Sequence, residues 1–310
     1  MQFTASSSES KTRSRLRDQS PFMRTLRRLT SNRSAQAGSL IVGALILIAI
    51  FADVIAPYEY DQQIRQPGLR RRSPPCIHLF GCDLERPQLL MGLDSNFRDL
   101  FSRVVHGSRL SLQIGFLTTG AAILIGTLLG SVAGYAGGWI DNIIMRLMDV
   151  LMAFPSLLLA IAIVSVLGPG LVNTLLAVAI VSIPVYARVV RSSVLSIKEM
   201  EFILASRALG ASSARILFVR ILPNALTPVI VVGTLGIATA ILDAAGLSFL
   251  GLGAQPPTPE WGLMLGEERN SVFNAPHLVF FPGIAIVLTV LGFNLLGDGL
   301  RDALDPRRKA

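Results

Sequence analysis

Residues 150–187 read VLMAFPSLLLAIAIVSVLGPGLVNTLLAVAIVSIPVYA and contain no charged side chain. A helix needs about 20 mostly apolar residues to cross the hydrocarbon core of a bilayer. These 38 residues are therefore too many for one crossing and enough for two. The sequence Gly168-Pro169-Gly170 lies where the turn between the two helices must fall, because glycine and proline interrupt helices. The stretch predicts a hairpin of two membrane-spanning helices.

The composition of the whole chain supports a membrane protein. Of its 310 residues, 51% are hydrophobic and only 15% are charged, whereas about a quarter of the residues of an average soluble protein are charged. A soluble protein of this length could not cover its surface with so few charges. The apolar content also excludes a disordered or collagen-like chain, and two cysteines exclude a disulfide scaffold. We predict an all-α integral membrane protein.

Four further apolar intervals complete the predicted spans, since ionisable residues are costly inside the membrane. They are residues 40–52, 110–134, 226–253 and 278–296, and only the third contains a charge, Asp243. The total is six membrane-spanning helices. The first is predicted to be retained rather than cleaved as a signal peptide, because the segment before it is too long and no small-x-small cleavage site follows.

The distribution of lysine and arginine predicts the orientation. With the N-terminus inside, the cytoplasmic regions 1–39, 135–149, 188–225 and 297–310 hold 19 of the 28 basic residues. The long outer segment 57–109 holds eight of the others, together with six acidic residues. Both termini are therefore expected in the cytoplasm. We interpret the net charge of +8 as an anchor to anionic lipid and not as a nucleic-acid surface.

The predicted organisation has five parts: a basic cytoplasmic segment (1–38), the first transmembrane helix (39–56), an external loop (57–108), a five-helix core (109–300) and a cytoplasmic tail (301–310).

Two segments beside the spans have the pattern of surface helices. In the first, Phe22, Leu26 and Leu29 share one face, which predicts a helix in the inner interface. The second lies in the external loop and has apolar residues at i, i+3, i+4, i+7 and i+8. Its apolar positions are Phe97, Leu100, Phe101, Val104 and Val105, and its expected solvent-exposed positions are Arg98, Asp99, Ser102 and Arg103. We interpret it as a collar along the membrane surface, with substrate contact as the alternative.

Motifs of catalysis and metal binding are absent from the sequence. It contains no G-x-x-x-x-G-K-[ST], no G-x-S-x-G and no H-E-x-x-H. Its three histidines do not have metal-ligand spacing. Cys76 and Cys82 lie in the external loop, where they could form a disulfide or remain free thiols. We therefore expect no catalysis, no metal and no cofactor on this chain.

The most informative cytoplasmic segment is 198–224, KEMEFILASRALGASSARILFVRILPN. Glu199 and Glu201 favour the start of a helix through its dipole. Gly210 is expected to end that helix, and Pro223 to end a second short one. Most residues between 205 and 214 are small, which lets another backbone approach closely. A plain connector is the alternative, although a loop of this length with helical patterning is often functional.

This segment resembles the cytoplasmic motif of the permease subunits of ATP-driven (ABC) importers, E-A-A-x-x-x-G-(nine residues)-I-x-L-P. The matching positions are Ala205, Gly210, Leu222 and Pro223. The differing positions are Leu204, Ser206 and Arg220. ASRALGAS and ILPNALTP are closer still to the peptide/nickel branch of the family.

Three other stretches are similar to that branch. They are LDSNFRDLFSRVVHGSRLSL (93–112), GLSFLGLGAQPPTPEWG (246–262) and FNLLGDGLRDALDP (293–306). In the first, residues 96–99 replace part of a pattern that usually reads Gly-Arg-Asp. The resemblance covers the chain from about residue 20 to the C-terminus.

The resemblance implies a type I ABC importer permease fold with a cytoplasmic coupling helix, in a bacterial plasma membrane. It implies a second homologous permease subunit, two ATPase subunits that bind ATP and Mg, and an extracytoplasmic solute-binding protein. The coupling residues that it implies are Glu201, Ala205, Ser206, Arg207, Gly210, Ala211, Leu222, Pro223 and Asn224. The implied substrate is a dipeptide or oligopeptide, with nickel or another small solute as the alternative.

Two further groups of charged residues are candidate sites. Asp243 is the only acid well inside a span, so we interpret it either as a polar helix contact or as a path-lining group or latch. Asp298, Arg301 and Asp305 have i, i+3 and i, i+4 spacing, which predicts an ion network at the end of the last helix. Contact of Arg301 with the ATPase is the alternative.

Two other classes of protein remain open at this point. An ATP-independent carrier or channel would transport without an ATPase. A membrane-anchored assembly or signalling protein would use 206–214 only for docking. Uptake that depends on an ATPase partner separates both from an importer subunit.

Overall fold

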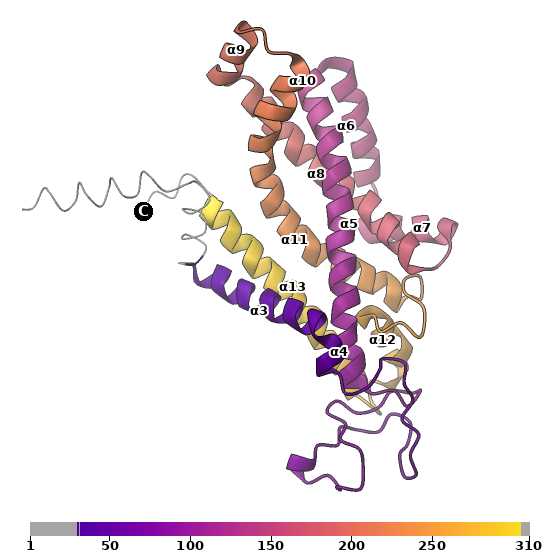
Figure 1. Cartoon of the computed structure of the whole chain (residues 1–310). Coiled ribbons are helices and arrows are strands. Elements are labelled where there is room, and N and C mark those ends of the chain that lie inside the picture. Colours follow the sequence, from indigo (N-terminus) through magenta and orange to yellow (C-terminus); the bar gives the residue numbers. More distant parts are fainter. Residues whose placement is uncertain (1–29, 31, 305–310) are drawn as a thin grey trace, which may run out of the picture.

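The structure, a computed structural model, describes residue 30 and residues 32–304 (Figure 1). This part of the chain is helical and forms no β-strand, only three isolated β-bridges between residues 63 and 99. The elements are α3 (Arg33–Ile50), α4 (Ala52–Ile55), η1 (His78–Phe80), α5 (Leu100–Ala136), α6 (Gly138–Met152), α7 (Ser156–Leu167), α8 (Leu171–Lys198), α9 (Glu201–Ala208), α10 (Ser213–Arg215), η2 (Ile216–Ile221), α11 (Leu222–Phe249), α12 (Trp261–Glu268), η3 (Arg269–Ser271) and α13 (His277–Leu304). The predicted interfacial helix at Phe22, Leu26 and Leu29 lies outside the described residues.

The predicted all-α membrane architecture is confirmed. Five helical segments of the described chain are long and apolar enough to cross a membrane: α3, α5, α8, the run 213–249 and α13. Helices α6 and α7 together form a sixth span if the pair is counted as a single broken span, and the two helices are bent by 91° relative to each other. The turn predicted at Gly168-Pro169-Gly170 lies between α7 and α8.

The third span differs from the prediction. Residues 135–149 were expected to form a cytoplasmic loop, but α6 covers Gly138–Met152. The helix stops before Pro155, because proline has no N–H and disfavours the helical conformation of the residue before it. A new helix, α7, begins at Ser156 and has only 12 residues.

The predicted collar helix is also corrected. Leu100 is the first residue of α5, which continues for 37 residues to Ala136. Asp99 caps this helix, since its carboxylate accepts a hydrogen bond from the Ser102 N–H at 2.8 Å. The apolar pattern from residue 97 onward is therefore the entry of a long transmembrane helix and not a separate surface helix.

Small residues allow the closest helix contacts. Gly126, Gly130 and Gly134 lie one turn apart on α5 and face the backbone or side chains of α8. Helix α3 packs mainly on α13. Its cap, Asn32, donates to the Asp302 carboxylate near the end of α13 at 3.1 Å. Helices α3 and α13 are therefore antiparallel, and the two ends of the described chain lie together (Figure 1).

The bundle has two distinct ends (Figure 1). Helices α9 and α10 lie at one end, whereas α12 and residues 57–99 lie at the other. We keep the name external loop, which reflects the predicted orientation, for residues 57–99. One core cluster surrounds Trp261 and Phe293 toward the α12 end. A second surrounds Met148, Tyr186 and Ile203 toward the α9 end.

Candidate functional site

Helix α9 is fixed to the bundle rather than suspended on a flexible loop. Helix α8 ends at Lys198, whose Nζ donates to the Gly134 carbonyl of α5 at 3.1 Å. Helix α9 begins three residues later, with Glu201 in its first turn, where a carboxylate interacts favourably with the helix dipole. Its residue Ile203 is fully buried in the cluster that contains Ile216 and Ile221 of η2. A displacement of α9 is therefore transmitted to η2 through this packing.

Gly210 ends α9 in a Schellman motif. The Gly210 N–H donates to the Arg207 carbonyl at 3.0 Å, and the Ala211 N–H donates to the Ser206 carbonyl at 3.1 Å. Gly210 has φ of +82°, a conformation that glycine adopts without strain. The predicted break at Gly210 is thus present, and Ser212 then caps α10 through the Arg215 N–H.

Helix α9 presents apolar side chains to its surroundings. Phe202, Leu204 and Leu209 are 43%, 48% and 88% exposed, and we call these three residues the coupling surface. The predicted coupling residues Glu201, Ala205, Arg207 and Gly210 are exposed on the same short element, and Ser206 and Ala211 are half-buried. Several exposed apolar side chains on one short, anchored element are typical of a protein contact.

The remaining predicted coupling residues start α11. Pro223 was expected to end a short helix, but the helix continues through it from Ser213 to Phe249. The π-helical segment η2 precedes it, and the Leu222 N–H donates to the Leu217 carbonyl five residues back. This wider turn accommodates a residue without an N–H. Asn224 is exposed, and its amide donates to the Arg220 carbonyl at 2.7 Å.

Two ion pairs, which no pattern in the sequence indicated, join α6 to α8. Arg191 donates to both carboxylate oxygens of Asp141, at 2.5 and 2.6 Å. Arg188 donates to Asp149 at 2.6 Å. Such bidentate geometry is the strong form of an arginine–carboxylate contact. The two pairs hold the α9-side parts of these helices together.

A buried ionic network lies at the opposite end of the bundle. Arg98 donates to Asp94 at 2.6 Å and to Glu267 at 3.3 Å. Arg103, which is 1% exposed, contacts the same Glu267 at 3.4 Å. Its guanidinium also donates to the Tyr60 and Pro257 carbonyls, at 3.2 and 3.1 Å. The network joins the external loop, α5 and α12.

This network overturns the prediction that Arg98, Asp99, Ser102 and Arg103 face water. All four are buried, because the external loop and α12 fold over the start of α5. Helical periodicity identified a polar face correctly but could not identify what covers it. No signal in the local pattern pointed to Glu267.

The acidic residues of α12 have different electrostatic environments. Burial raises the pKa of Glu267, although Arg103 and Arg98 act in the opposite direction. Burial alone would also raise the pKa of Glu268, but hydrogen bonds from Ser95 and Arg72 hold that pKa below its ordinary value. The Ser95 N–H donates to Glu268 at 3.0 Å, and Arg72 donates at 2.9 Å. Glu268 is thus a second tie between the external loop and α12.

Cys76 and Cys82 form a disulfide in the external loop, with their Cα atoms 5.4 Å apart. The bond closes a small ring whose residues Leu79 and Phe80 are exposed. Cys76 itself is buried, and its backbone pairs with that of Leu89. The ring is therefore fixed at its base.

The predicted charged sites within and beside the spans stay apart in the structure. Asp243, on α11, is half-buried and has no hydrogen bond or ion pair with any described residue. Asp298 and Arg301, both on α13, form no ion pair with each other in the described part of the chain. This part of the predicted network is therefore not formed, and Arg301 instead lines a pocket with residues of α11 such as Val231 and Leu235. Asp305 lies outside the described residues. Among the described residues, no three His, Cys, Asp or Glu are grouped as metal ligands would be.

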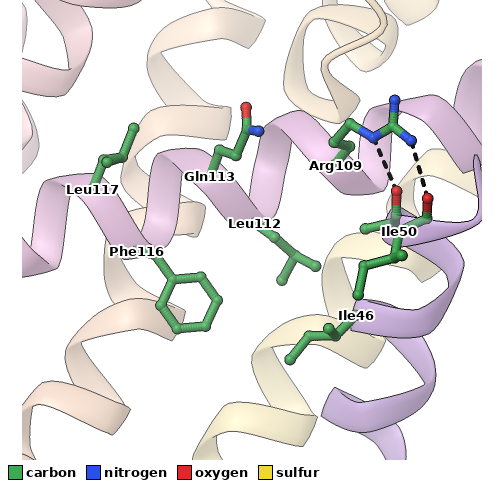
Figure 2. A pocket seen from close by; sticks show the side chains of 8 residues that line it. Ile46, Ile50, Arg109, Leu112, Gln113, Phe116 and Leu117 are labelled. Carbon is green, nitrogen blue, oxygen red and sulfur yellow. Dashed lines mark hydrogen bonds between the residues drawn. The ribbon is translucent and has the colours of Figure 1, made fainter.

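A groove of about 710 Å³ lies between α3 and α5 (Figure 2). Its walls are mostly apolar, including Ile46, Leu112 and Phe116. At one end, Arg109 donates to the Ala49 and Ile50 carbonyls at 2.9 and 3.2 Å. These carbonyls have no partner within α3 because the helix ends there. Arg109 thus ties the end of α3 to α5, and the groove contains none of the predicted site residues.

Comparison with known families decides the identity of the chain. Residues 126–310 match the family described as "Binding-protein-dependent transport system inner membrane component". The chain belongs to this family. Residues 20–75 match a second family, the N-terminal transmembrane domain of oligopeptide transport permease C. The predicted membership in the dipeptide/oligopeptide branch of ABC importer permeases is confirmed, and the chain is a multi-pass inner-membrane component.

Related permeases cover nearly the whole chain. The dipeptide transport system permease DppC of Alkalihalophilus pseudofirmus is 50% identical over 94% of this chain and 91% of its own length. The di/tripeptide permease DppC of Pseudomonas aeruginosa is 46% identical over 94% and 93%. The glutathione permease GsiD of Escherichia coli is 49% identical over 93% and 91%.

A solved structure of an ABC transporter has the same fold. A chain of the inward-facing MetNI methionine transporter superposes with a TM-score of 0.55 at 21% identity, over 66% of this permease and 98% of that chain. The predicted type I importer permease fold is therefore confirmed.

Proposed function

We propose that this permease forms half of the translocation path of an ATP-driven importer of dipeptides or oligopeptides. Its relatives include permeases for dipeptides, di/tripeptides and glutathione, which supports a peptide substrate. The observation that carries the coupling role is the coupling surface: Phe202, Leu204 and Leu209 are exposed on and just after a helix that buried Ile203 anchors to the bundle.

The coupling mechanism follows from this anchoring. An ATPase subunit that binds the coupling surface displaces α9 when the ATPase closes on ATP. Because Ile203 is packed on η2, and η2 continues into α11, the displacement moves a transmembrane helix as a rigid body. A flexible loop would absorb the same motion. The closure must favour one state of the bundle by a few kcal/mol to change its population decisively.

The proposed assembly contains a second homologous permease, two ATPases that bind ATP and Mg, and an extracytoplasmic solute-binding protein. The ATPases contact the α9 end, which we place in the cytoplasm with both termini, because the flanking regions are rich in arginine and lysine. The binding protein approaches the α12 end. In this scheme the chain is a non-catalytic subunit and binds no cofactor itself. We further propose that Asp243, which has no partner among the described residues, lines the path.

A pair of matched glycine variants tests the coupling role. Gly210 and Gly251 both have φ of +82°, and a Cβ at either would meet nothing within 4 Å. Valine in this conformation costs about 1–2 kcal/mol or more at each position. Only Gly210 lies beside the coupling surface, whereas Gly251 follows α11 at the other end of the bundle.

Reconstituted complexes would be assayed for peptide uptake and for ATP hydrolysis. Gly210→Val should insert normally but lower the ratio of peptide transported to ATP hydrolysed by at least about tenfold, a loss of about 1.4 kcal/mol in coupling. Gly251→Val should leave this ratio unchanged. Normal uptake by Gly210→Val at normal expression would refute the coupling role. Uptake of a metal chelate but of no peptide would refute the substrate class.

A further inference from the structure

The third span is broken within its length. Helix α6 follows the upper part of α5 in Figure 1, and α7 turns away from it. Residues 153–155 form the break, at which the helix axis bends by 91°. The Arg188–Asp149 pair precedes the break by one turn, and the 12 residues of α7 separate the break from the turn at Gly168. The break therefore lies within the charge-free stretch 150–187, which predicts two membrane spans.

Backbone groups at this break have no hydrogen-bond partner in the described part of the chain. The Leu151 carbonyl would accept from residue 155 in a continuous helix, but Pro155 has no N–H. The Met152 and Phe154 carbonyls also accept no hydrogen bond, and the Ser156 N–H donates none. The Ser156 hydroxyl is likewise unpaired. Both donors and acceptors are thus free at one place.

The same residues are exposed on the surface of this subunit. Met152 and Phe154 are 45% and 56% exposed, and Ala153, Pro155 and Ser156 are also exposed. An unpaired backbone group in hydrocarbon costs several kcal/mol. Irregular backbone at membrane depth is therefore tolerated only where protein buries it or where it lines a water-filled cavity. No other part of the described chain covers these groups, so contact with hydrocarbon would be strongly unfavourable for them.

We propose that residues 152–156 line the aqueous translocation path and that their free carbonyl and N–H groups form hydrogen bonds with the backbone of a passing peptide. The substrate part of this proposal rests on the proposed peptide function. Every peptide carries one donor and one acceptor per residue, with the exception of proline. Backbone groups in the wall can therefore bind transiently to peptides of many sequences, without selecting among their side chains.

Thiol labelling in the complete transporter tests this assignment. The two native cysteines are joined in a disulfide, so an introduced cysteine is the only free thiol of this chain. Phe154→Cys and the nearly isosteric Ser156→Cys place a thiol at the break. Leu47→Cys is the matched control, because Leu47 and Phe154 are both 56% exposed and Leu47 lies in the regular helix α3. The probe is a charged, water-soluble methanethiosulfonate reagent, applied to both sides of the membrane with and without ATP.

Cysteine reacts as the thiolate, which forms readily only where water is present. Both break variants should react at least about tenfold faster than Leu47→Cys in one or more states of the transport cycle, and a transported dipeptide should slow them. Reaction of both at the rate of Leu47→Cys in every state would overturn the proposal and would indicate that a neighbouring subunit buries the break. Fast reaction that no transported peptide slows would overturn the peptide contact. A transporter that takes up no peptide would instead refute the proposed function, independently of the labelling rates.

Discussion

Replacing Arg103 with methionine should release the external loop from the transmembrane bundle. Methionine keeps most of the side-chain volume but removes the charge and all the donors. Glu267 would then face only Arg98, at 3.3 Å, and the Tyr60 and Pro257 carbonyls would lose donors at 3.2 and 3.1 Å. Breaking a buried ion pair by removing one partner costs about 3–5 kcal/mol. Because Glu267 keeps its contact with Arg98, Arg103→Met should cost about 3 kcal/mol, the lower end of that range.

A matched control is available in the same network. Arg72 pairs with Glu268 at 2.9 Å, but its side chain is 43% exposed. Solvent screens the exposed Arg72 guanidinium, and the buried Glu268 keeps the hydrogen bond from the Ser95 N–H, so Arg72→Met should cost only about 1 kcal/mol. The two variants remove the same chemical group from neighbouring carboxylates, and they differ mainly in the burial of the arginine that is replaced.

Hydrogen exchange of residues 57–99 in the assembled complex measures the effect, because this region can open without unfolding of the bundle. At about 1.4 kcal/mol per factor of ten, Arg103→Met should speed exchange about a hundredfold. Arg72→Met should speed it by less than about tenfold. Adding Glu267→Gln to Arg103→Met should recover part of the loss, since it removes the stranded charge. Equal exchange in the two single variants would refute the claim that buried charges lock the external loop.

Two further predictions concern the membrane helices. Gly38→Leu should destabilise the detergent-solubilised protein by about 1–3 kcal/mol, because its Cβ would collide with the backbone nitrogen of Leu296. Gly43→Leu on the same helix should be neutral, because a Cβ at Gly43 meets nothing within 4 Å. Equal melting temperatures of the two variants would contradict this packing. Asp243→Asn should leave the melting temperature unchanged or raise it, because the carboxylate has no partner among the described residues, while peptide uptake falls several-fold. Full uptake by Asp243→Asn would assign the residue to a passive helix contact.

Local signals in the sequence predicted the parts of the fold that local chemistry determines. The turn at Gly168-Pro169-Gly170 and the break at Gly210 both depend on a few adjacent residues, and both lie where expected. The count of apolar, charge-free intervals likewise predicted the membrane class, because the cost of a buried charge applies to each residue separately.

Features that depend on distant residues could not be predicted in the same way. The burial of Arg103 requires Glu267, which lies 164 positions later in the chain. A polar face at the start of α5 is equally consistent with water and with a buried network, and only the fold decides between them. Pro155 can interrupt a helix, but spans counted from charge-free residues alone do not take a proline into account. Pro223 gave the opposite error, because the π-helical turn of η2 absorbs the proline that was expected to end a helix.

The pairing of α3 with α13 has a consequence for biogenesis. Helix α3 precedes all other described spans during synthesis, yet its main neighbour is the last one, and the Asn32–Asp302 hydrogen bond joins positions 270 residues apart. The small-residue face around Gly38 therefore has no native partner until translation of α13 is complete. Chains truncated before α13 would leave this face uncovered in the membrane, so insertion of α13 is the step that completes the packing of the first span.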